Sequence, residues 1–380
     1  MVHKKFTQWY QDIIAIPSIS AFDAHLDQSN LAIIEYLAER FQQLGFHIDI
    51  QPVPGTRHKF NMLATVGSGE GGLLLAGHSD TVPFDEGRWN SDPFALKQVE
   101  QRFYGLGTCD MKGFFAFILA ALEEMPLHKL RKPLYILATA DEETSMAGAR
   151  FFASQQKVKP QMAIIGEPTE LKPIYKHKGH MAHRIDIVGQ AGHSSDPARG
   201  VNAMEILHDA LGQLLQVKDQ LRQRKDDSFS VPECTLNLGH VHGGDGENRI
   251  CGHCHMTFDV RPLPGMQDDE VVALLDEALA PVQQKWPNRL TRDFLYPSAP
   301  AFGCNNEYQI IELAERLTGF SAEPANYATE APFINALGCD TLVLGPGSIK
   351  QAHQPDEFID LHYVDPTVNL LRGFIQQICH

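Results

Sequence analysis

Residues 133–143 read PLYILATADEE, an apolar run that ends in three consecutive acidic side chains. Similar short apolar runs occur at 71–77 (GGLLLAG), 162–166 (MAIIG) and 340–347 (DTLVLGPG), and residues 27–45 have helical apolar spacing. Continuous apolar runs that alternate with amphipathic helices are typical of parallel strands buried on both faces. The sequence therefore predicts an α/β fold, with a mixed, mostly parallel sheet and helices on both faces.

The middle of the chain, at about 180–292, has a different pattern. Strand-like segments and two amphipathic helices, at 201–221 and 268–282, follow one another there in the order β-α-β-β-α-β. This order is typical of a ferredoxin-like α+β unit. We therefore expect a second domain inserted into a larger one, which would comprise residues 1–179 and 293–380.

Composition narrows the class of protein. The chain has 380 residues, of which 43% are hydrophobic and 21% charged, as is typical of a globular protein of one large domain or two. A net charge of −15 argues against a nucleic-acid partner, which needs a basic surface. The longest apolar stretch, 113–122, is shorter than the ~20 residues of a membrane helix, and no targeting segment is visible. We expect a cytoplasmic protein with no membrane partner and, because its seven cysteines are scattered, no disulfide framework.

Imidazole and carboxylate side chains follow several of the predicted strands. In an open α/β sheet the carboxyl edge of the strands is where ligands bind. This mixture of donors suits zinc or a similar divalent ion, and a carboxylate can bridge two such ions about 3.5–4 Å apart. Metal charge would then offset the repulsion among the crowded acids. The candidates are His78, Asp80, Asp110, Glu142, Glu143, Glu167 and His353.

Six segments resemble the M20 metallopeptidase and deacylase family, in the family's order and over essentially the whole chain. They are GHSDTVP, GTCDMKG, ADEETSMAG, GEPT, GHSSDPARGVNA and AHQPDEF. The resemblance implies two divalent ions bridged by Asp110, most often zinc, with cobalt as an alternative. His78 and Glu167 would bind one ion, and Glu143 and His353 would bind the other.

The resemblance also implies roles around the metal pair. Glu142 would be the general base that activates the attacking water, and Asp80 would orient the His78 ring. The inserted domain would form a homodimer, in which His193 of one protomer donates a hydrogen bond to the oxyanion in the other. The expected reaction is hydrolysis of the amide of a small N-acyl amino acid.

Of all the functional residues, those that bind the substrate are the ones that the sequence constrains least. Arg249, beside Asn248, resembles the family's carboxylate-binding position, and an arginine can hold a carboxylate through two parallel hydrogen bonds. A domain-packing ion pair is the alternative role for Arg249. Glu330 is the candidate partner for a side-chain ammonium of the substrate. A succinylated substrate would need basic residues instead, and Lys176 and Lys178 are the candidates for that role.

Several residues also have ordinary structural interpretations. The segment CGHCH (251–255) could indicate a zinc or redox site, but we expect an ordinary strand with Cys251 and Cys254 on opposite faces. Glu167 could be a plain turn acid and His193 an exposed loop histidine. A dimer that uses this scaffold without catalysis is also possible. We interpret the remaining histidines as surface or interface residues: His240, His242, His253 and His255.

Overall fold

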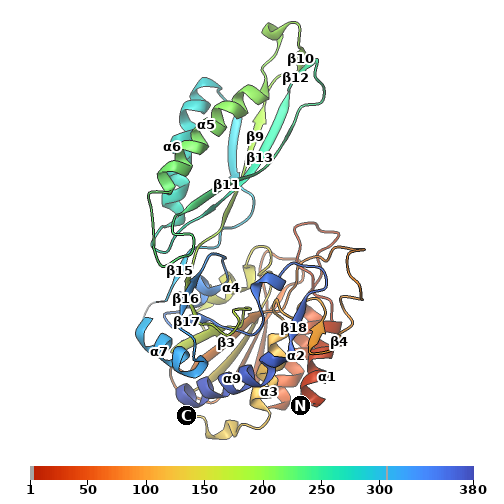
Figure 1. Ribbon diagram of the computed structural model, residues 1–380, viewed down its shortest axis with the longest axis vertical. Helices are drawn as coiled ribbons and strands as arrows, with labels where there is room; N and C mark the ends of the chain where they lie inside the picture. The colour runs from red at the N-terminus through yellow and green to blue at the C-terminus, as the bar shows by residue number, and fades with distance from the viewer. Residues whose placement is uncertain (1–3, 305–306) are drawn as a thin grey trace. The chain divides into compact units, whose positions relative to one another are not determined.

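A computed structural model describes residues 4–304 and 307–380, and the chain divides into two compact units (Figure 1). Unit 1 comprises Met1–Tyr175, Cys304–Glu323 and Thr329–His380, and unit 2 comprises Lys176–Gly303 and Pro324–Ala328. Unit 2 is therefore longer than the expected inserted domain, because short segments on both sides of 180–292 group with it.

Unit 1 is built around a mixed sheet with a parallel centre. The central strands lie in the order β6 (Leu134–Thr139), β3 (Leu73–His78), β7 (Met162–Ile165) and β17 (Asp340–Val343), and all run parallel. Every residue of these strands is buried, as their continuous apolar sequences predict. Antiparallel strands extend the sheet on both sides: β2 (Phe60–Val66) and β1 (His47–Pro52) beyond β6, and β8 (Ile174–His177) beyond β17.

Helices cover both faces of this sheet, which confirms the predicted fold class. On one face lie α2 (Leu31–Gln43), α3 (Phe114–Leu122), α7 (Glu307–Thr318) and α9 (Val364–Cys379), with α1 (Lys4–Ala15) packed on α3. On the other face lie α4 (Ala147–Gln155) and α8 (Ala331–Asn335), which contact each other. Strand side chains alternate between these faces. Thr139 of β6 therefore reaches Glu330 at the start of α8, whereas Gly77 of β3 faces α3.

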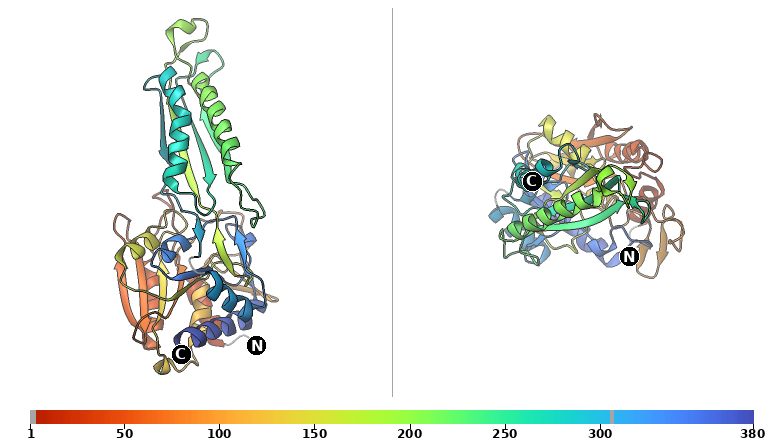
Figure 2. Two further views of the ribbon diagram at one scale, coloured as in Figure 1. Left: turned by 90° about the vertical axis from the view of Figure 1, so that its left-hand side faces the viewer. Right: turned by 90° about the horizontal axis from the view of Figure 1, so that it is seen from above.

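Unit 2 has the predicted β-α-β-β-α-β order. Its main elements are β9 (Met181–Val188), α5 (Ala203–Leu221), β11 (Thr235–Gly243), β13 (His253–Arg261), α6 (Asp268–Lys285) and β14 (Leu290–Phe294). The strands pair antiparallel in the spatial order β11-β13-β9-β14. Figure 2 shows α5 and α6 side by side on the same face of this sheet, where one apolar core lies between helices and strands.

A pair of very short strands completes unit 2. β10 (Gly192–His193) pairs antiparallel with β12 (Arg249–Ile250). In the part of the chain that the structure describes, no helix is long and apolar enough to cross a membrane.

Candidate metal centre

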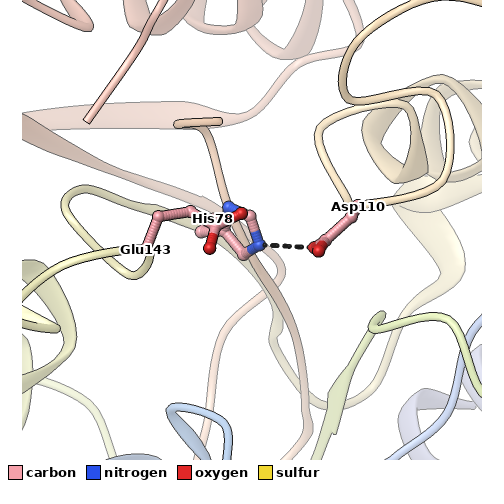
Figure 3. A group of neighbouring side chains, drawn as sticks. All are labelled: His78, Asp110 and Glu143. Carbon is pink, nitrogen blue, oxygen red and sulfur yellow. Dashed lines mark hydrogen bonds and ion pairs between the residues drawn. The ribbon is translucent and has the colours of Figure 1, made fainter. Parts of the chain in front are cut away.

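The carboxyl ends of the central strands bring predicted ligands from distant segments together. Nε2 of His78, the last residue of β3, lies 3.2 Å from Asp110 Oδ1 (Figure 3). The same nitrogen lies 3.7 Å from Glu167 Oε1. Nε2 of His353 lies 3.0 Å from Glu143 Oε2 and 3.6 Å from Asp110 Oδ2. The two oxygens of Asp110 thus face two different histidines, which is the arrangement that a bridging carboxylate requires.

Two overlapping sets of donors are compact enough to hold an ion. One set is His78, Asp110 and Glu143, and the other is His78, Glu142 and Glu167, with the ligand atoms of each set within 4.8 Å of one another. Glu142 therefore lies as close to His78 as the predicted ligands do. Distance alone does not separate a base from a ligand, so the assignment of Glu142 as the base stays a prediction.

The electrostatics of this cluster fit a cation. Burial raises the pKa of Glu142, Glu143 and Glu167, and repulsion from neighbouring carboxylates raises it further. Glu143 Oε1 is buried and has no hydrogen-bond partner among the described residues. Buried carboxylate charge needs compensation, and imidazole and carboxylate donors match the preferences of zinc and similar divalent ions. The residues present therefore fit the divalent metal that the sequence predicts.

Asp80 contacts the centre in two ways. Its backbone carbonyl lies 3.0 Å from His78 Nδ1, whereas its carboxylate Oδ1 is 3.7 Å from the same nitrogen. The carbonyl accepts the Nδ1–H, which leaves Nε2 to face the predicted ligands. The carboxylate instead accepts the backbone N–H groups of Glu142 at 3.3 Å and Glu143 at 3.2 Å. Asp80 thus holds both the ring and the loop of acids in place.

Asp141, the first of the three consecutive acids, is neutralised by a lysine that sequence analysis missed. Its Oδ1 lies 2.9 Å from Lys59 Nζ and accepts a hydrogen bond from Ser20 Oγ at 2.7 Å. Lys59 is buried and lies 2.7 Å from Asp27 as well. The repulsion among the three consecutive acids is therefore partly offset within the protein, because Asp141 pairs with a lysine that it shares with Asp27. A lysine just before the apolar strand FNMLATV was the available signal.

Sequence analysis also missed Glu357, a residue that is 1% exposed. It accepts three backbone N–H groups, from Gly107 at 3.0 Å, Cys109 at 2.6 Å and Asp110 at 2.9 Å. Burial raises its pKa to about 8, although these hydrogen bonds act in the opposite direction. Glu357 follows His353 by four positions in the chain. It therefore joins the loop that carries Asp110 to the segment that carries His353.

The cysteines are free and buried. The Sγ of Cys109, beside the bridging candidate, donates to the Ser348 carbonyl at 3.4 Å. Cys251 and Cys254 both belong to the core of unit 2, so their predicted placement on opposite faces was wrong. The reason is that β13 begins only at His253, and the alternation of a strand does not extend back to Cys251.

Three residues predicted from two distant segments are neighbours in unit 2. His193 pairs with Arg249 across β10 and β12, and Ser194 N donates to the Asn248 carbonyl at 3.0 Å. Arg249 is exposed and its guanidinium lies 2.6 Å from Asp245. The structure therefore brings His193, Asn248 and Arg249 into one exposed group.

Glu330 lies at the start of α8 in unit 1. Its side chain is fully buried, with Oε2 accepting a hydrogen bond from Thr139 Oγ1 at 2.6 Å, and burial raises its pKa to about 7. The charges of His78 and Asp80 act on this carboxyl group, so Glu330 lies near the metal centre, and its pairing with a substrate ammonium stays a prediction. The lysines suggested for a succinylated substrate are engaged within unit 2. Lys176 pairs with Asp226 at 2.7 Å, and Lys178 donates to the Glu233 carbonyl at 2.7 Å.

The comparison with protein-family models agrees with this geometry. The model described as peptidase family M20/M25/M40 matches residues 74–377. The chain belongs to this family. Enzymes of the M20 family are typically metal-dependent hydrolases with two zinc ions, which agrees with the donor sets around His78.

Solved structures share the M20 fold along nearly the full chain. A tripeptidase from Staphylococcus aureus is 17% identical, with a TM-score of 0.77 and coverage of 98% of each chain. A metallo-carboxypeptidase from Sulfolobus solfataricus is 17% identical, with a TM-score of 0.78 and coverage of 98% of this chain and 99% of that one. Human carnosine dipeptidase 1 is 18% identical, with a TM-score of 0.71 and coverage of 98% and 96%. At these identities the similarity establishes the fold and leaves the substrate open.

Proposed function

We propose that this M20 enzyme removes the acetyl group from N2-acetyl-L-ornithine, releasing L-ornithine and acetate, as a cytoplasmic step of arginine biosynthesis. The observation that carries the hydrolase part is Asp110, whose two oxygens face His78 and His353 at the centre of the acidic cluster. The assignment of the substrate rests on the amino-acid sequence alone. The segments HLDQSN, QPVPGTRHKFNML, NYATEAPF and LGPGSIKQAHQPDE resemble acetylornithine deacetylase.

Within this proposal, His78, Asp110, Glu143, Glu167 and His353 would hold two divalent ions. When bound, such ions polarise the carbonyl of the scissile amide and lower the pKa of the attacking water. The protein's residues orient these groups and move the proton.

Glu142 is the residue that moves the proton in this scheme. Burial raises the pKa of its carboxyl group, so Glu142 is a stronger base than an exposed glutamate. Glu142 takes a proton from the water as the water oxygen bonds to the acetyl carbon. It then passes the proton to the ornithine α-nitrogen as the carbon–nitrogen bond breaks, so acetate and a free amine leave.

His193 would stabilise the oxyanion in the active site of a partner protomer, in a homodimer formed through unit 2. The backbone N–H of Ser195 donates to His193 Nδ1 at 3.2 Å. In the neutral ring the proton then sits on Nε2, which is the donor that an oxyanion needs. Arg249 would release Asp245 and bind the substrate carboxylate instead. This exchange costs little free energy, because an exposed ion pair contributes little to stability.

Succinyl-diaminopimelate desuccinylase is the alternative activity within the family, and the engaged state of Lys176 and Lys178 counts against it. The test measures steady-state hydrolysis of N2-acetyl-L-ornithine, N-succinyl-diaminopimelate and a dipeptide by the zinc-loaded protein, with and without a chelator. We expect chelator-sensitive turnover with the highest kcat/KM for acetylornithine. Preference for the succinyl substrate or the dipeptide would overturn the substrate assignment and retain the metal centre. Absence of turnover with bound metal would favour the non-catalytic scaffold.

A further inference from the structure

The sheet of unit 2 carries histidines on the face that α5 and α6 leave uncovered. Along β13, the side chains of Cys254, Met256 and Phe258 enter the core beneath the helices. The residues between them, which include His255, therefore point to the opposite, outer face. Three further histidines surround His255, with ring centroids 5.5–6.0 Å from its own: His240, His242 and His253.

A β-bulge places two of these histidines on the outer face. The register of β11 against β13 shifts between Leu238 and His240, which leaves Gly239 as an extra residue. Because side chains alternate, one extra residue exchanges the two faces of the strand beyond it. Without the bulge, His240 and His242 would turn to the inner face, where Leu236 lies. The bulge instead gives β11 an apolar inner segment followed by two outward imidazoles.

The result is a compact trio of imidazoles on adjacent strands. His242 and His255 are direct cross-strand partners, and His240 is two residues from His242 on the same face. The ring centroids of His240 and His242 lie 5.5 Å and 5.7 Å from that of His255. Nδ1 of His255 is buried and has no hydrogen-bond partner among the described residues. A buried ring nitrogen without a partner is costly and leaves an available ligand atom.

We propose that His240, His242 and His255 bind one divalent transition-metal ion of the zinc or nickel type. Imidazole is a preferred ligand of these ions, and its ordinary pKa near 6.5 leaves the free ring neutral above pH 7. Two histidines at i and i+2 on one strand and a third on its neighbour give three donors on one face, with a fourth position left for water. The trio does not form a donor set as compact as those around His78, so metal binding requires rotation of the exposed rings.

The chain around the trio offers supporting groups. Asp186 of β9 pairs in register with His255, and its Oδ1 lies 3.7 Å from His253 Nε2. Arg184 holds this carboxylate through two bonds, at 2.6 and 2.8 Å, so Asp186 is oriented beside the imidazoles. The ion would join edge strand β11 to β13 just past the bulge, where the ladder is interrupted. Its role would therefore be to stabilise unit 2, because an ion that binds only the folded state raises stability.

The test counts zinc ions bound to the full-length protein by equilibrium dialysis at pH 7.5, followed by elemental analysis. We expect wild type to bind one more zinc per chain than His240→Asn/His242→Asn or His255→Asn. Loss of one of three ligands should weaken this site by more than about 100-fold, which exceeds the usual effect of an outer-shell partner. His208→Asn is the matched control, because His208 is a histidine of unit 2 whose side chain is 89% exposed. It should bind as many ions as wild type.

Metal selectivity and thermal stability test the proposed site separately from the catalytic centre. Nickel should bind the trio and magnesium should not, since magnesium prefers oxygen ligands. Zinc should raise the melting temperature more in wild type than in His242→Asn, while kcat of the zinc-loaded variant stays at the wild-type value. Equal zinc stoichiometry in wild type and His255→Asn, or an extra ion that persists in the double variant, would overturn the site.

Discussion

The backbone N–H of Asp110 donates to Oε1 of Glu357 at 2.9 Å, although 247 positions separate the two residues in the sequence. The same oxygen accepts the N–H of Cys109, and the other oxygen accepts that of Gly107. One buried carboxylate therefore fixes the loop from which Asp110 reaches both histidines. The metal centre depends on this contact as well as on its ligands.

Glu357→Gln should weaken metal binding and lower turnover. An amide group would turn an N–H donor toward at least one backbone N–H, so the loop would lose part of its support. We expect metal affinity and kcat to fall by about 10- to 100-fold, as for outer-shell partners of metal ligands, with a smaller change in KM. Metal titration and the visible spectrum of the cobalt-loaded variant would measure the effect. Asp365→Asn is the control, because Asp365 is an exposed acid of the same C-terminal segment.

Glu142→Gln and Glu143→Gln should separate the base from the ligand. Loss of a general base costs about 10²- to 10⁴-fold in rate, and the metal count should not change. Loss of Glu143 should instead reduce bound metal, because its Oε2 faces His353 at 3.0 Å. Metal content and single-turnover kinetics of both variants would show this. Loss of metal in Glu142→Gln would mean that Glu142 is the ligand, as the compact set with His78 and Glu167 permits.

His193→Asn should lower kcat with little effect on folding, since the residue is exposed. Removal of one oxyanion donor costs about 10²- to 10³-fold in kcat. Mixing the His193→Asn and Glu142→Gln variants provides the sharper test. If His193 acts in the partner's site, a mixed dimer has one site with both intact residues, and activity should partly return. Mixed dimers without recovered activity would contradict action across the dimer.

Lys59→Met should destabilise unit 1 and disturb the acidic loop. Removal of one partner of a buried ion pair typically costs about 3–5 kcal/mol, because the other charge is left uncompensated. Asp141 would lose its cation at 2.9 Å, and Glu142 and Glu143 follow it directly in the chain. Denaturant unfolding should show the loss of stability. Because Lys59 pairs with both Asp27 and Asp141, Lys59→Met/Asp27→Asn/Asp141→Asn should recover much of it, and failure to recover would contradict these pairings.

The sequence predicted the parts of the site that depend on strand ends. His78 and Glu167 follow apolar runs that can only be buried strands, so their place at the carboxyl edge follows from the fold. The supporting contacts could not be predicted in this way. Glu357 and Lys59 act through partners far along the chain, and a single sequence carries no periodic signal for such contacts. The bulge at Gly239 was also hidden, because alternation alone gave no indication that the strand changes faces there.

Acid should destabilise unit 2 through three of its histidines. Burial lowers the pKa of His177, His180 and His183 to about 4, against an ordinary value of 6.5. Between these values the unfolded chain binds more protons than the folded one, so stability rises with pH. Stability is therefore unaffected by these histidines above pH 6.5 and falls as pH drops toward 4. The loss is on the order of 2 kcal/mol for each histidine.

The clearest variant for this acid effect is His180→Phe. His180 packs against Tyr296 with ring centroids 5.7 Å apart, so a phenyl ring can keep the aromatic contact without titrating. Urea unfolding at pH 7, 5.5 and 4.5 should show a smaller loss of stability in this variant than in wild type. The exposed His208 again supplies the control, as His208→Phe should retain the wild-type pH dependence. A variant that loses stability with acid as steeply as wild type would show that protonation of His180 does not drive the transition.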